Sequence, residues 1–439
     1  MRAAGPATLL LTGLVLVACG PASRSVSPEP AYGAILISID TLRADGLGCY
    51  GHPLPTSPHI DRLRENAILF PTAIANGAST LISHASIFTS LAPPQHGASM
   101  RRRRALAPEA LTLAEVLREQ GLATASFNGG AQLDAAFGVA QGFDLYEIGD
   151  GPDDPFDVVV DRAVRWLADH GERRFFLFLH TYEVHHPYRP SAEDLAALGL
   201  AYEGDLPSSI PLDLLREINS GQRPLAPGDL EFIRRAYDAQ IRSVDRALGR
   251  LVDELQARAL YDRVLLVLTS DHGEEFGEHG VVGHHSHTVF DELLRVPLLV
   301  KLPESAHGGR TVDAMVAGID VAPTIVAGLG FEIPPSFDGV DLVALVEGRT
   351  EGPEQVLSKV DGGATSVRTA RWKWAQKRLY DLQEDPGEKT DVQAAHPEQA
   401  AALRRLKDEL LARRPAGVGN PIEVEEALHE QLRELGYVE

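Results

Sequence analysis

A threonine and a histidine one helical turn apart form the first candidate reactive site. In the segment Ala78 to Ser86, a helix that begins at or just before Thr80 places Thr80 and His84 on one face, with the hydroxyl at the positive helix end. Far along the chain, Asp271 and His272 can hold a divalent cation, which lowers the pKa of a coordinated hydroxyl. Together these residues predict a nucleophile beside a metal. Each motif alone also fits an N-capping threonine and a surface turn.

Three short apolar runs are expected to position these residues. The runs are typical of buried parallel strands and extend from Ala34 to Ile39, from Phe175 to Leu179 and from Val264 to Thr269. The first leads into Asp40, the second into His180 and then His185, and the third into Asp271 and His272. Because ligands bind beyond the carboxyl ends of the strands in open α/β sheets, these residues predict one site at a single sheet edge.

Helical patterns lie between the strands. They extend from Pro58 to Ala67, from Leu111 to Gln120, from Phe156 to His170 and from Glu231 to Ala257. This alternation predicts an α/β fold with a mixed, mostly parallel sheet sandwiched by helices. The irregular stretch from Pro190 to Gly228 is either a solvated surface insertion or a lid over the site.

The pattern changes after about residue 350, which divides a catalytic domain at 32–350 from a C-terminal part at 351–439. Short strands and amphipathic helices predict a small α+β subdomain there. The expected strands are Gln355 to Val360, Thr365 to Thr369 and Arg371 to Gln376, and the expected helices are Pro397 to Arg414 and Glu423 to Leu435.

The N-terminal residues are typical of an export signal. Arg2 precedes the apolar run Leu9 to Val17, which is too short to span a membrane, and Leu16 to Cys19 resembles a bacterial lipoprotein box. We therefore interpret residues 1–18 as a lipoprotein signal peptide, Cys19 as the lipidated residue and residues 19–31 as a flexible tether. This predicts an exported protein anchored to the bacterial cell envelope, by default at the outer membrane. An uncleaved core helix is the alternative.

The composition limits the partners. The chain has 41 Lys and Arg against 62 Asp and Glu, a net charge of −21, which argues against nucleic acid and against an anionic lipid surface as the main partner. We expect a small anionic ester as substrate, bound by local positive groups, and membrane contact through the lipid anchor alone. The sequence leaves the oligomeric state open.

Many further motifs occur along the chain in a fixed order. They are Asp40 to Asp45, Leu47 to Gly51, Thr80 to Ser90 with Gln95 to Gly97, His185 to Tyr188, Tyr237 to Gly249, Thr269 to Glu274, Leu294 to Leu298, Ile319 to Thr324, and Leu379 to Leu382 with Asp385 to Glu388. From Ile35 to Asp391 the chain thereby resembles the sulfatase family of the alkaline phosphatase superfamily. The resemblance implies an alkaline phosphatase-like fold and an ester hydrolase.

The resemblance also implies roles for single residues. Asp40, Asp271 and His272 correspond to metal ligands, and Thr80 to the nucleophile that bridges metal and substrate. Two carboxylates and an imidazole are suitable ligands for a divalent cation.

Further positions correspond to residues that contact the substrate. His185 and His284 correspond to substrate-binding and leaving-group residues, and a protonated histidine can donate to a departing alkoxide. His84 and Asn128 fall at or near other substrate contacts of the family. Arg43 either clamps an anion or pairs with Asp45.

The departures from the family pattern concern the nucleophile and the metal. Sulfatases usually have a Cys or Ser that is oxidised to formylglycine, but here Thr80 carries a β-methyl group that blocks this conversion, and Ile82 and His84 replace the Pro and Arg of the motif. The pattern is similar to the threonine branch of the superfamily, whose members attack phosphate mono- and diesters. Thr41 replaces a second metal-binding Asp, so the smaller set of oxygen and nitrogen ligands favours one Mn²⁺ or Zn²⁺, with Ca²⁺ as the alternative.

Several alternatives remain. The chain could be a conventional sulfuric ester hydrolase, a phosphoglycerol or phosphoethanolamine transferase, or an inactive lipoprotein that binds anionic glycans. A second metal is not favoured, because Asp238 and Asp245 are followed four residues later by Arg242 and Gly249 rather than by histidine. A histidine-rich loop either adds a metal ligand or lines a polar pocket; it contains His279, His284, His285 and His287.

Overall fold

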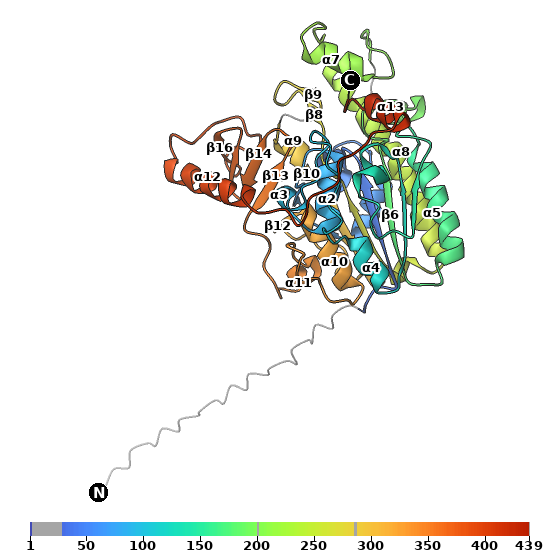
Figure 1. The fold of residues 1–439 in the computed structure, drawn as a ribbon. Coiled ribbons are helices and arrows are strands. Elements are labelled where there is room, and N and C mark those ends of the chain that lie inside the picture. Colours follow the sequence, from blue (N-terminus) through green and yellow to red (C-terminus); the bar gives the residue numbers. More distant parts are fainter. Residues whose placement is uncertain (2–28, 200–201, 285–287, 439) are drawn as a thin grey trace.

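A seven-stranded sheet forms the centre of the computed structural model, which describes residue 1 and residues 29–199, 202–284 and 288–438 (Figure 1). Neighbours from β7 to β5 are parallel, whereas β11 is antiparallel to both β7 and β2. The predicted mixed, mostly parallel sheet is confirmed. Cys19, with the predicted signal and lipidation, lies outside the described residues. The strand order is β2 (Ile68–Leu69), β11 (Leu298–Lys301), β7 (Val264–Thr269), β1 (Gly33–Ile39), β6 (Phe175–Thr181), β4 (Ala123–Asn128) and β5 (Leu145–Ile148).

Helices cover both faces of this sheet because side chains on each strand alternate between two apolar cores. On β1, Ile35 and Ile37 join the core beneath α1 (Pro58–Glu65), α5 (Phe156–His170) and α8 (Asp229–Ala257). Ala34 and Leu36 join the core beneath α2 (Thr80–Thr89), α4 (Leu113–Glu119) and α10 (Val321–Gly328). The predicted helix over Phe156–His170 is confirmed at both ends.

Smaller elements connect these layers. The described residues of the stretch 190–228 form two short helices, α6 (Ala192–Ala197) and α7 (Leu212–Asn219). None of the helices in the described part of the chain has the length and apolar content needed to cross a bilayer. The remaining short helices and strands are α3 (Pro93–His96), α6 (Ala192–Ala197), α7 (Leu212–Asn219), α9 (Asp291–Leu294), α11 (Leu342–Val346), β3 (Thr72–Ile74), β8 (Glu275–Phe276), β9 (Val282–Gly283), β10 (Arg295–Val296) and β12 (Met315–Ala317). Single turns of 3-10 helix occur at Ala44–Gly46, Gly48–Tyr50, Ala131–Leu133, Ala135–Phe137, Tyr261–Arg263, Pro303–Ser305 and Gly318–Asp320.

The C-terminal part forms the predicted α+β subdomain and then returns to the main domain. Its antiparallel sheet consists of β13 (Val356–Lys359), β14 (Thr365–Arg368), β15 (Trp372–Ala375) and β16 (Arg378–Asp381), and packs against α12 (Pro397–Leu411). The last helix, α13 (Glu426–Glu434), leaves this sheet and lies beside the upper part of the main domain (Figure 1). Leu428, Leu432 and Leu435 join the core beneath α2. The end of the chain is thereby brought close to Thr80.

Candidate active site

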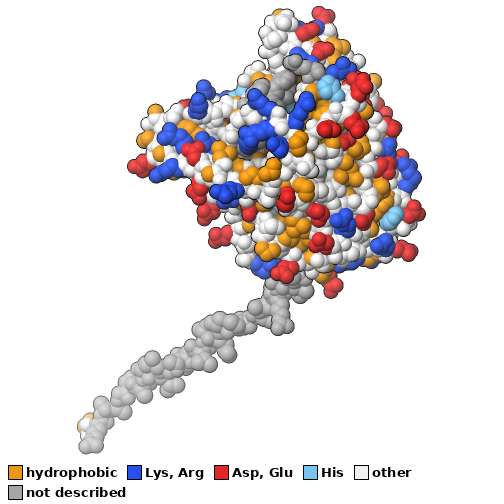
Figure 2. All heavy atoms as spheres, viewed as in Figure 1, with side chains coloured by type: hydrophobic (Ala, Val, Ile, Leu, Met, Phe, Trp, Pro, Cys, Tyr) orange, Lys and Arg blue, Asp and Glu red, His pale blue; other side chains and the backbone are white. Residues whose placement is uncertain are grey.

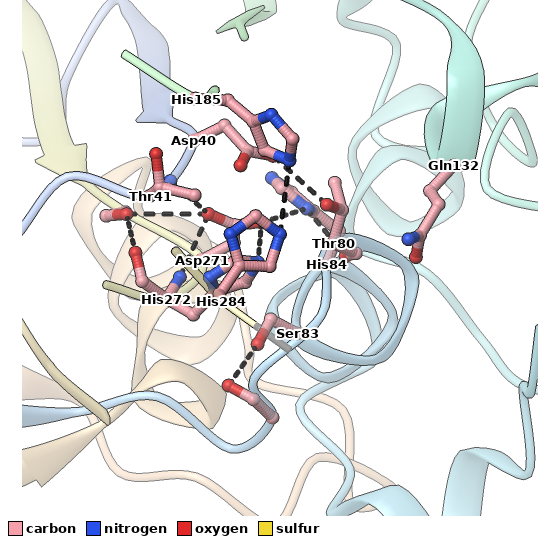
Figure 3. Close-up of polar contacts among 12 residues, drawn as sticks. Asp40, Thr41, Thr80, Ser83, His84, Gln132, His185, Asp271, His272 and His284 are labelled. Atoms are coloured by element: carbon pink, nitrogen blue, oxygen red, sulfur yellow. Dashed lines mark hydrogen bonds and ion pairs between the residues drawn. The ribbon is translucent and has the colours of Figure 1, made fainter. Parts of the chain in front are cut away.

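The ends of three neighbouring strands meet at Thr80, as the sequence predicts (Figure 3). Asp40 follows β1, Asp271 lies two residues beyond β7, and His180 lies near the end of β6. Thr80 begins α2 and donates a hydrogen bond from Oγ1 to Asp40 Oδ2 at 3.0 Å. All four side chains are fully buried. The hydroxyl therefore has a fixed position next to a carboxylate.

His84 holds the start of α2 in place. Its Nδ1 donates to the Thr80 carbonyl at 2.8 Å, and its Nε2 accepts from Ser38 Oγ of β1 at 2.9 Å. Both ring nitrogens are thus used within the protein. In this structure His84 connects the nucleophile's helix to the central strand.

The predicted metal ligands lie together, with polar atoms that lack partners. Asp40 Oδ1, Asp271 Oδ2 and His272 Nε2 are buried and have no hydrogen-bond partner among the described residues. His272 Nδ1 donates to the Gly273 carbonyl at 2.9 Å, so its Nε2 carries a lone pair. The ligand atoms of these three residues lie within 4.8 Å of one another. Because unpaired buried polar atoms are costly, this donor set fits a divalent cation.

The charges in this cluster are unequal. Burial, together with the nearby Asp271, raises the pKa of Asp40 well above its usual range. Burial opposes ionisation of Asp271 as well, but His272, His84 and His180 lower its pKa to about 2. A proton in the metal-free cluster therefore resides on Asp40.

A second group of imidazoles lies beyond Thr80. His185 Nε2 and His284 Nε2 are 3.1 Å apart, and Figure 3 shows the two rings reaching toward one another. Burial, reinforced by the neighbouring histidines, lowers the pKa of His185 well below its usual range. Burial lowers the pKa of His284 to about 4, although Glu274 acts in the opposite direction. Both rings are therefore neutral at neutral pH.

Tyr437 is the residue of this site that sequence reasoning missed. Its buried hydroxyl lies 3.2 Å from Thr80 Oγ1, 3.1 Å from His185 Nε2 and 3.3 Å from His284 Nε2. The tail is held by Gln431, whose Oε1 accepts from Ala131 N at 3.0 Å. No motif or spacing could have signalled a residue that is 357 positions from Thr80.

His186 was also given no role from the sequence, although it is adjacent to His185. Its Nε2 donates to the Leu435 carbonyl at 3.2 Å. The adjacency to His185 in the quoted His-His-Pro-Tyr motif was a signal for it.

Two predicted substrate contacts are engaged by other groups of the protein. Arg43 forms ion pairs with Asp45 at 2.6 Å and Glu278 at 2.5 Å, and it lines a separate cavity. Of the two readings left open, pairing with Asp45 is the one observed. Asn128 lies at the end of β4, where its amide donates to Ser126 Oγ at 3.0 Å and accepts from Gly130 N at 2.9 Å.

A cavity of about 450 Å³ leads from the surface to His284 and Tyr437. Its buried wall includes Ser79 and Gln132, whereas its exposed rim carries positive side chains. Figure 2 shows Lys and Arg side chains gathered on one part of this face of the molecule. The lining cationic residues are Arg101, Arg103 and Arg216, and the lining acid is Asp361. This opening favours an anion despite the negative net charge of the chain.

Known proteins share this sequence pattern and this fold. A family model described as Sulfatase matches residues 34–331. A multifunctional alkaline phosphatase superfamily protein, PehA of Trinickia caryophylli, is 28% identical over 300 residues, which cover 58% of each chain. Choline-sulfatase of Rhizobium meliloti is 33% identical over 190 residues, 40% of this chain and 36% of the relative. The chain thus spans less than two thirds of the length of both relatives.

Solved structures extend the comparison to the fold. The phosphonate monoester hydrolase of Agrobacterium radiobacter superimposes with a TM-score of 0.69 at 21% identity, covering 86% of this chain and 96% of the other. The predicted alkaline phosphatase-like fold is confirmed.

Proposed function

Because the chain belongs to the sulfatase family, we propose that it is a metal-dependent hydrolase of anionic esters that uses Thr80 as nucleophile and prefers phosphate mono- or diesters to sulfate esters. The observation that carries this proposal is the Thr80 hydroxyl, which donates to Asp40 at 3.0 Å beside three buried ligand atoms without partners. The resemblance of a threonine nucleophile to the phosphoester branch supports the ester preference.

The candidate metal ligands are Asp40, Asp271 and His272, with the Thr80 hydroxyl next to them. When bound, a divalent cation there lowers the pKa of a coordinated hydroxyl and offsets charge on the reacting group. The donor set of oxygen and nitrogen favours Mn²⁺ or Zn²⁺ over Ca²⁺.

The residues themselves define the proton and bond changes. Asp40 accepts the hydrogen bond of Thr80 and is the nearest base for its proton. Thr80 Oγ1 then forms a bond to phosphorus while the bond to the leaving oxygen breaks, and water later hydrolyses the phosphothreonine. His185 and His284 contact the Tyr437 hydroxyl, which itself contacts Thr80, so we assign these two histidines to the side of the departing oxygen.

The cavity supports a small anionic substrate. Arg101, Arg103 and Arg216 at its rim attract an anion, and Ser79, which precedes the nucleophile, lines its wall. Leu212 and Arg216 come from α7, so the stretch 190–228 contributes to the pocket for the organic part of the substrate.

Thr80→Ala tests the nucleophile with aryl phosphate, aryl phosphodiester and aryl sulfate as substrates. We expect phosphoester hydrolysis to fall by at least about 1,000-fold, which corresponds to about 4 kcal/mol in the barrier. Thr89→Ala is the matched control, since Thr89 lies at the other end of the same buried helix and donates to Ala85. Activity that survives in Thr80→Ala, or wild-type activity on the sulfate alone, would contradict the proposal.

The second candidate is a conventional sulfuric ester hydrolase, which the identity to choline-sulfatase favours. The same substrate panel separates the two functions, because this candidate requires sulfate turnover to exceed phosphoester turnover.

We also propose export and lipid anchoring at Cys19, supported by the lipoprotein box in the sequence. Labelling with a fatty acid in a bacterial host tests it: wild type should carry label in the membrane fraction, and Cys19→Ser should not. Equal labelling of both proteins would contradict the anchor.

A further inference from the structure

We propose that His185, His186 and His284 form a second divalent-cation site, which accepts a zinc-like ion and adjoins the Asp40–Asp271–His272 cluster, since the ring centroids of His272 and His284 are 4.8 Å apart. The three imidazoles are almost fully buried, and each brings a ring nitrogen to within 4.8 Å of the other two. The proposed site contains nitrogen ligands, whereas the first cluster contains two carboxylates.

The hydrogen bonds of the two facing rings leave two lone pairs pointed at one another. His284 Nδ1 faces Glu274 Oε1 at 3.0 Å, and His185 Nδ1 contacts the carbonyl of His186. Because an ionised carboxylate and a carbonyl only accept hydrogen bonds, both Nδ1 atoms carry hydrogen, and in two neutral rings both Nε2 atoms are then bare. These bare atoms nevertheless lie 3.1 Å apart.

The described groups cannot satisfy this arrangement by themselves. The nearest hydrogen is that of the Tyr437 hydroxyl, which lies 3.1 Å from one Nε2 and 3.3 Å from the other. One hydrogen serves one of the two nitrogens. In addition, His186 Nδ1 is buried without a hydrogen-bond partner among the described residues, and the nearby carboxylate oxygen of Glu274 is 4.0 Å away. A cation removes this surplus of lone pairs.

The spacing matches zinc coordination. Ligands at about 2.0–2.1 Å from a tetrahedral Zn²⁺ lie about 3.3 Å from one another. The distances among His185 Nε2, His284 Nε2 and the Tyr437 hydroxyl are 3.1, 3.1 and 3.3 Å, so these atoms have the spacing of one tetrahedral face. Three histidines with one further position are typical of a catalytic zinc site, and that position is occupied here by the hydroxyl of Tyr437.

The surroundings orient the ligands as zinc sites require. A carboxylate that accepts from the second nitrogen of a ligating histidine fixes its tautomer, and Glu274 does this for His284. Glu274 is itself held by the Tyr188 hydroxyl at 2.8 Å. Nitrogen donors favour Zn²⁺ and related transition ions over Ca²⁺ or Mg²⁺.

The effect of this site on catalysis rests on the proposed function, whereas the existence of the site does not depend on that function. Bare imidazole nitrogens present negative potential to a departing oxygen that is also negative. A cation held by His185, His186 and His284 makes this side of Thr80 positive, so that both oxygens of an in-line displacement meet positive charge.

Zinc counting on the purified full-length protein tests the site. After chelator treatment, equilibration with Zn²⁺ and removal of free ion, elemental analysis should find two zinc ions per wild-type chain. His284→Gln and Asp271→Ala should each retain one, and their combination none. The matched control is His429→Gln, an exposed histidine at the rim of the cavity, which should retain two. One zinc ion in wild type and in His284→Gln, with none in Asp271→Ala, would overturn the proposal.

Cobalt spectroscopy on the same proteins identifies the ligands independently of activity. Asp271→Ala loaded with one Co²⁺ should show the visible absorption of a four-coordinate nitrogen-rich site, and further replacement of His284 should abolish it. Glu274→Gln should weaken the second ion by about 10- to 100-fold and leave the first unchanged. If Asp271→Ala does not fold, stepwise Co²⁺ titration of wild type and His284→Gln gives the same answer, since wild type alone should show two steps.

The outcomes separate this site from the proposed function. A protein with two zinc ions that fails to cleave phosphoesters retains the site and overturns the function. A Thr80-dependent phosphoesterase with one ion at Asp271 retains the function and overturns the site.

Discussion

Two buried acidic clusters in this molecule differ in the origin of their positive charge. In one, Asp291 and Glu388 each contact Lys373 Nζ at 2.7 Å, and Asp291 also contacts Arg368 at 2.7 Å. In the other, the described groups that contact Asp40 and Asp271 are imidazoles, the hydroxyls of Thr80 and Ser270, and backbone groups, and one oxygen of each carboxylate lacks a hydrogen-bond partner among the described residues. Lys373, Asp40 and Asp271 are all fully buried.

This difference indicates that the cluster around Lys373 is a structural joint, which connects two parts of the fold, whereas the cluster around Asp40 is a binding site. Removing a carboxylate from water costs several kcal/mol unless a cation compensates for it. Lys373 provides this cation from β15 and joins the C-terminal sheet to α9. The cluster at Asp40 leaves the compensation to an ion from solution.

The largest effect should come from Asp271→Ala. Since it removes a metal ligand, we expect kcat/KM for the phosphoester substrate to fall at least about 1,000-fold. The free energy of unfolding of the metal-free protein should fall only slightly, because imidazoles and backbone N–H groups, and not a buried lysine or arginine, stabilise the Asp271 carboxylate. Kinetics and urea unfolding in the presence of chelator measure both quantities. A large loss of metal-free stability would show that this cluster is also a structural joint.

Lys373→Met should act on stability instead. Breaking a buried ion pair from one side costs about 3–5 kcal/mol, because Asp291 then keeps Arg368 as its partner while Glu388 loses its ion pair with Lys373. Urea unfolding should show this loss, and Lys377→Met, at an exposed position nearby, should show almost none. Equal stability of the two variants would contradict the structural role of the Lys373 ion pairs.

The clusters should also differ in their response to pH. The raised pKa of Asp40 means that the metal-free site holds a proton that a bound cation displaces. Affinity for Mn²⁺ should therefore increase with pH, by about tenfold per unit, until the pH exceeds this raised pKa. Titration calorimetry in two buffers should detect about one released proton, and Asp40→Asn should release none. An affinity independent of pH would refute the assignment of the proton.

The smallest effect should come from Asp45→Asn. Asp45 is 56% exposed where it pairs with Arg43, and such pairs contribute up to about 1 kcal/mol. We expect a loss of stability within that limit and a KM changed less than about twofold. A large rise in KM would show that Arg43 binds the substrate.

Sequence reasoning succeeded where a local pattern determines the structure. The almost wholly apolar runs of β1, β6 and β7 predicted three buried parallel strands, which the structure places side by side, and the residues after them predicted the meeting of Asp40 and Asp271. It missed β4, because its sequence Ala-Thr-Ala-Ser-Phe-Asn mixes polar with apolar residues although all six are buried. A strand of this kind is recognised only once its neighbours cover it.

The part of the site that sequence reasoning did not identify is formed by tertiary contacts. The helix over Glu423 to Leu435 was predicted, but its position against the core beneath α2 depends on contacts far apart in the sequence. The roles of Tyr437 and His186 follow from that position. The predicted single metal ion stays a prediction, because it was based on spacing, which does not show that His185 and His284 converge.

The position of Tyr437 has a kinetic consequence. A phosphorus atom attacked by Thr80 must approach Oγ1 to about 3–3.5 Å, and the Tyr437 hydroxyl already lies 3.2 Å from it. A bound substrate must therefore either fit beside this hydroxyl or displace it. If it displaces the hydroxyl, the observed affinity for substrate equals the intrinsic affinity multiplied by the fraction of molecules in which Tyr437 has withdrawn. Residues that hold the C-terminal tail, such as Gln431, then influence how fast the active site opens to substrate as well as the shape of that site.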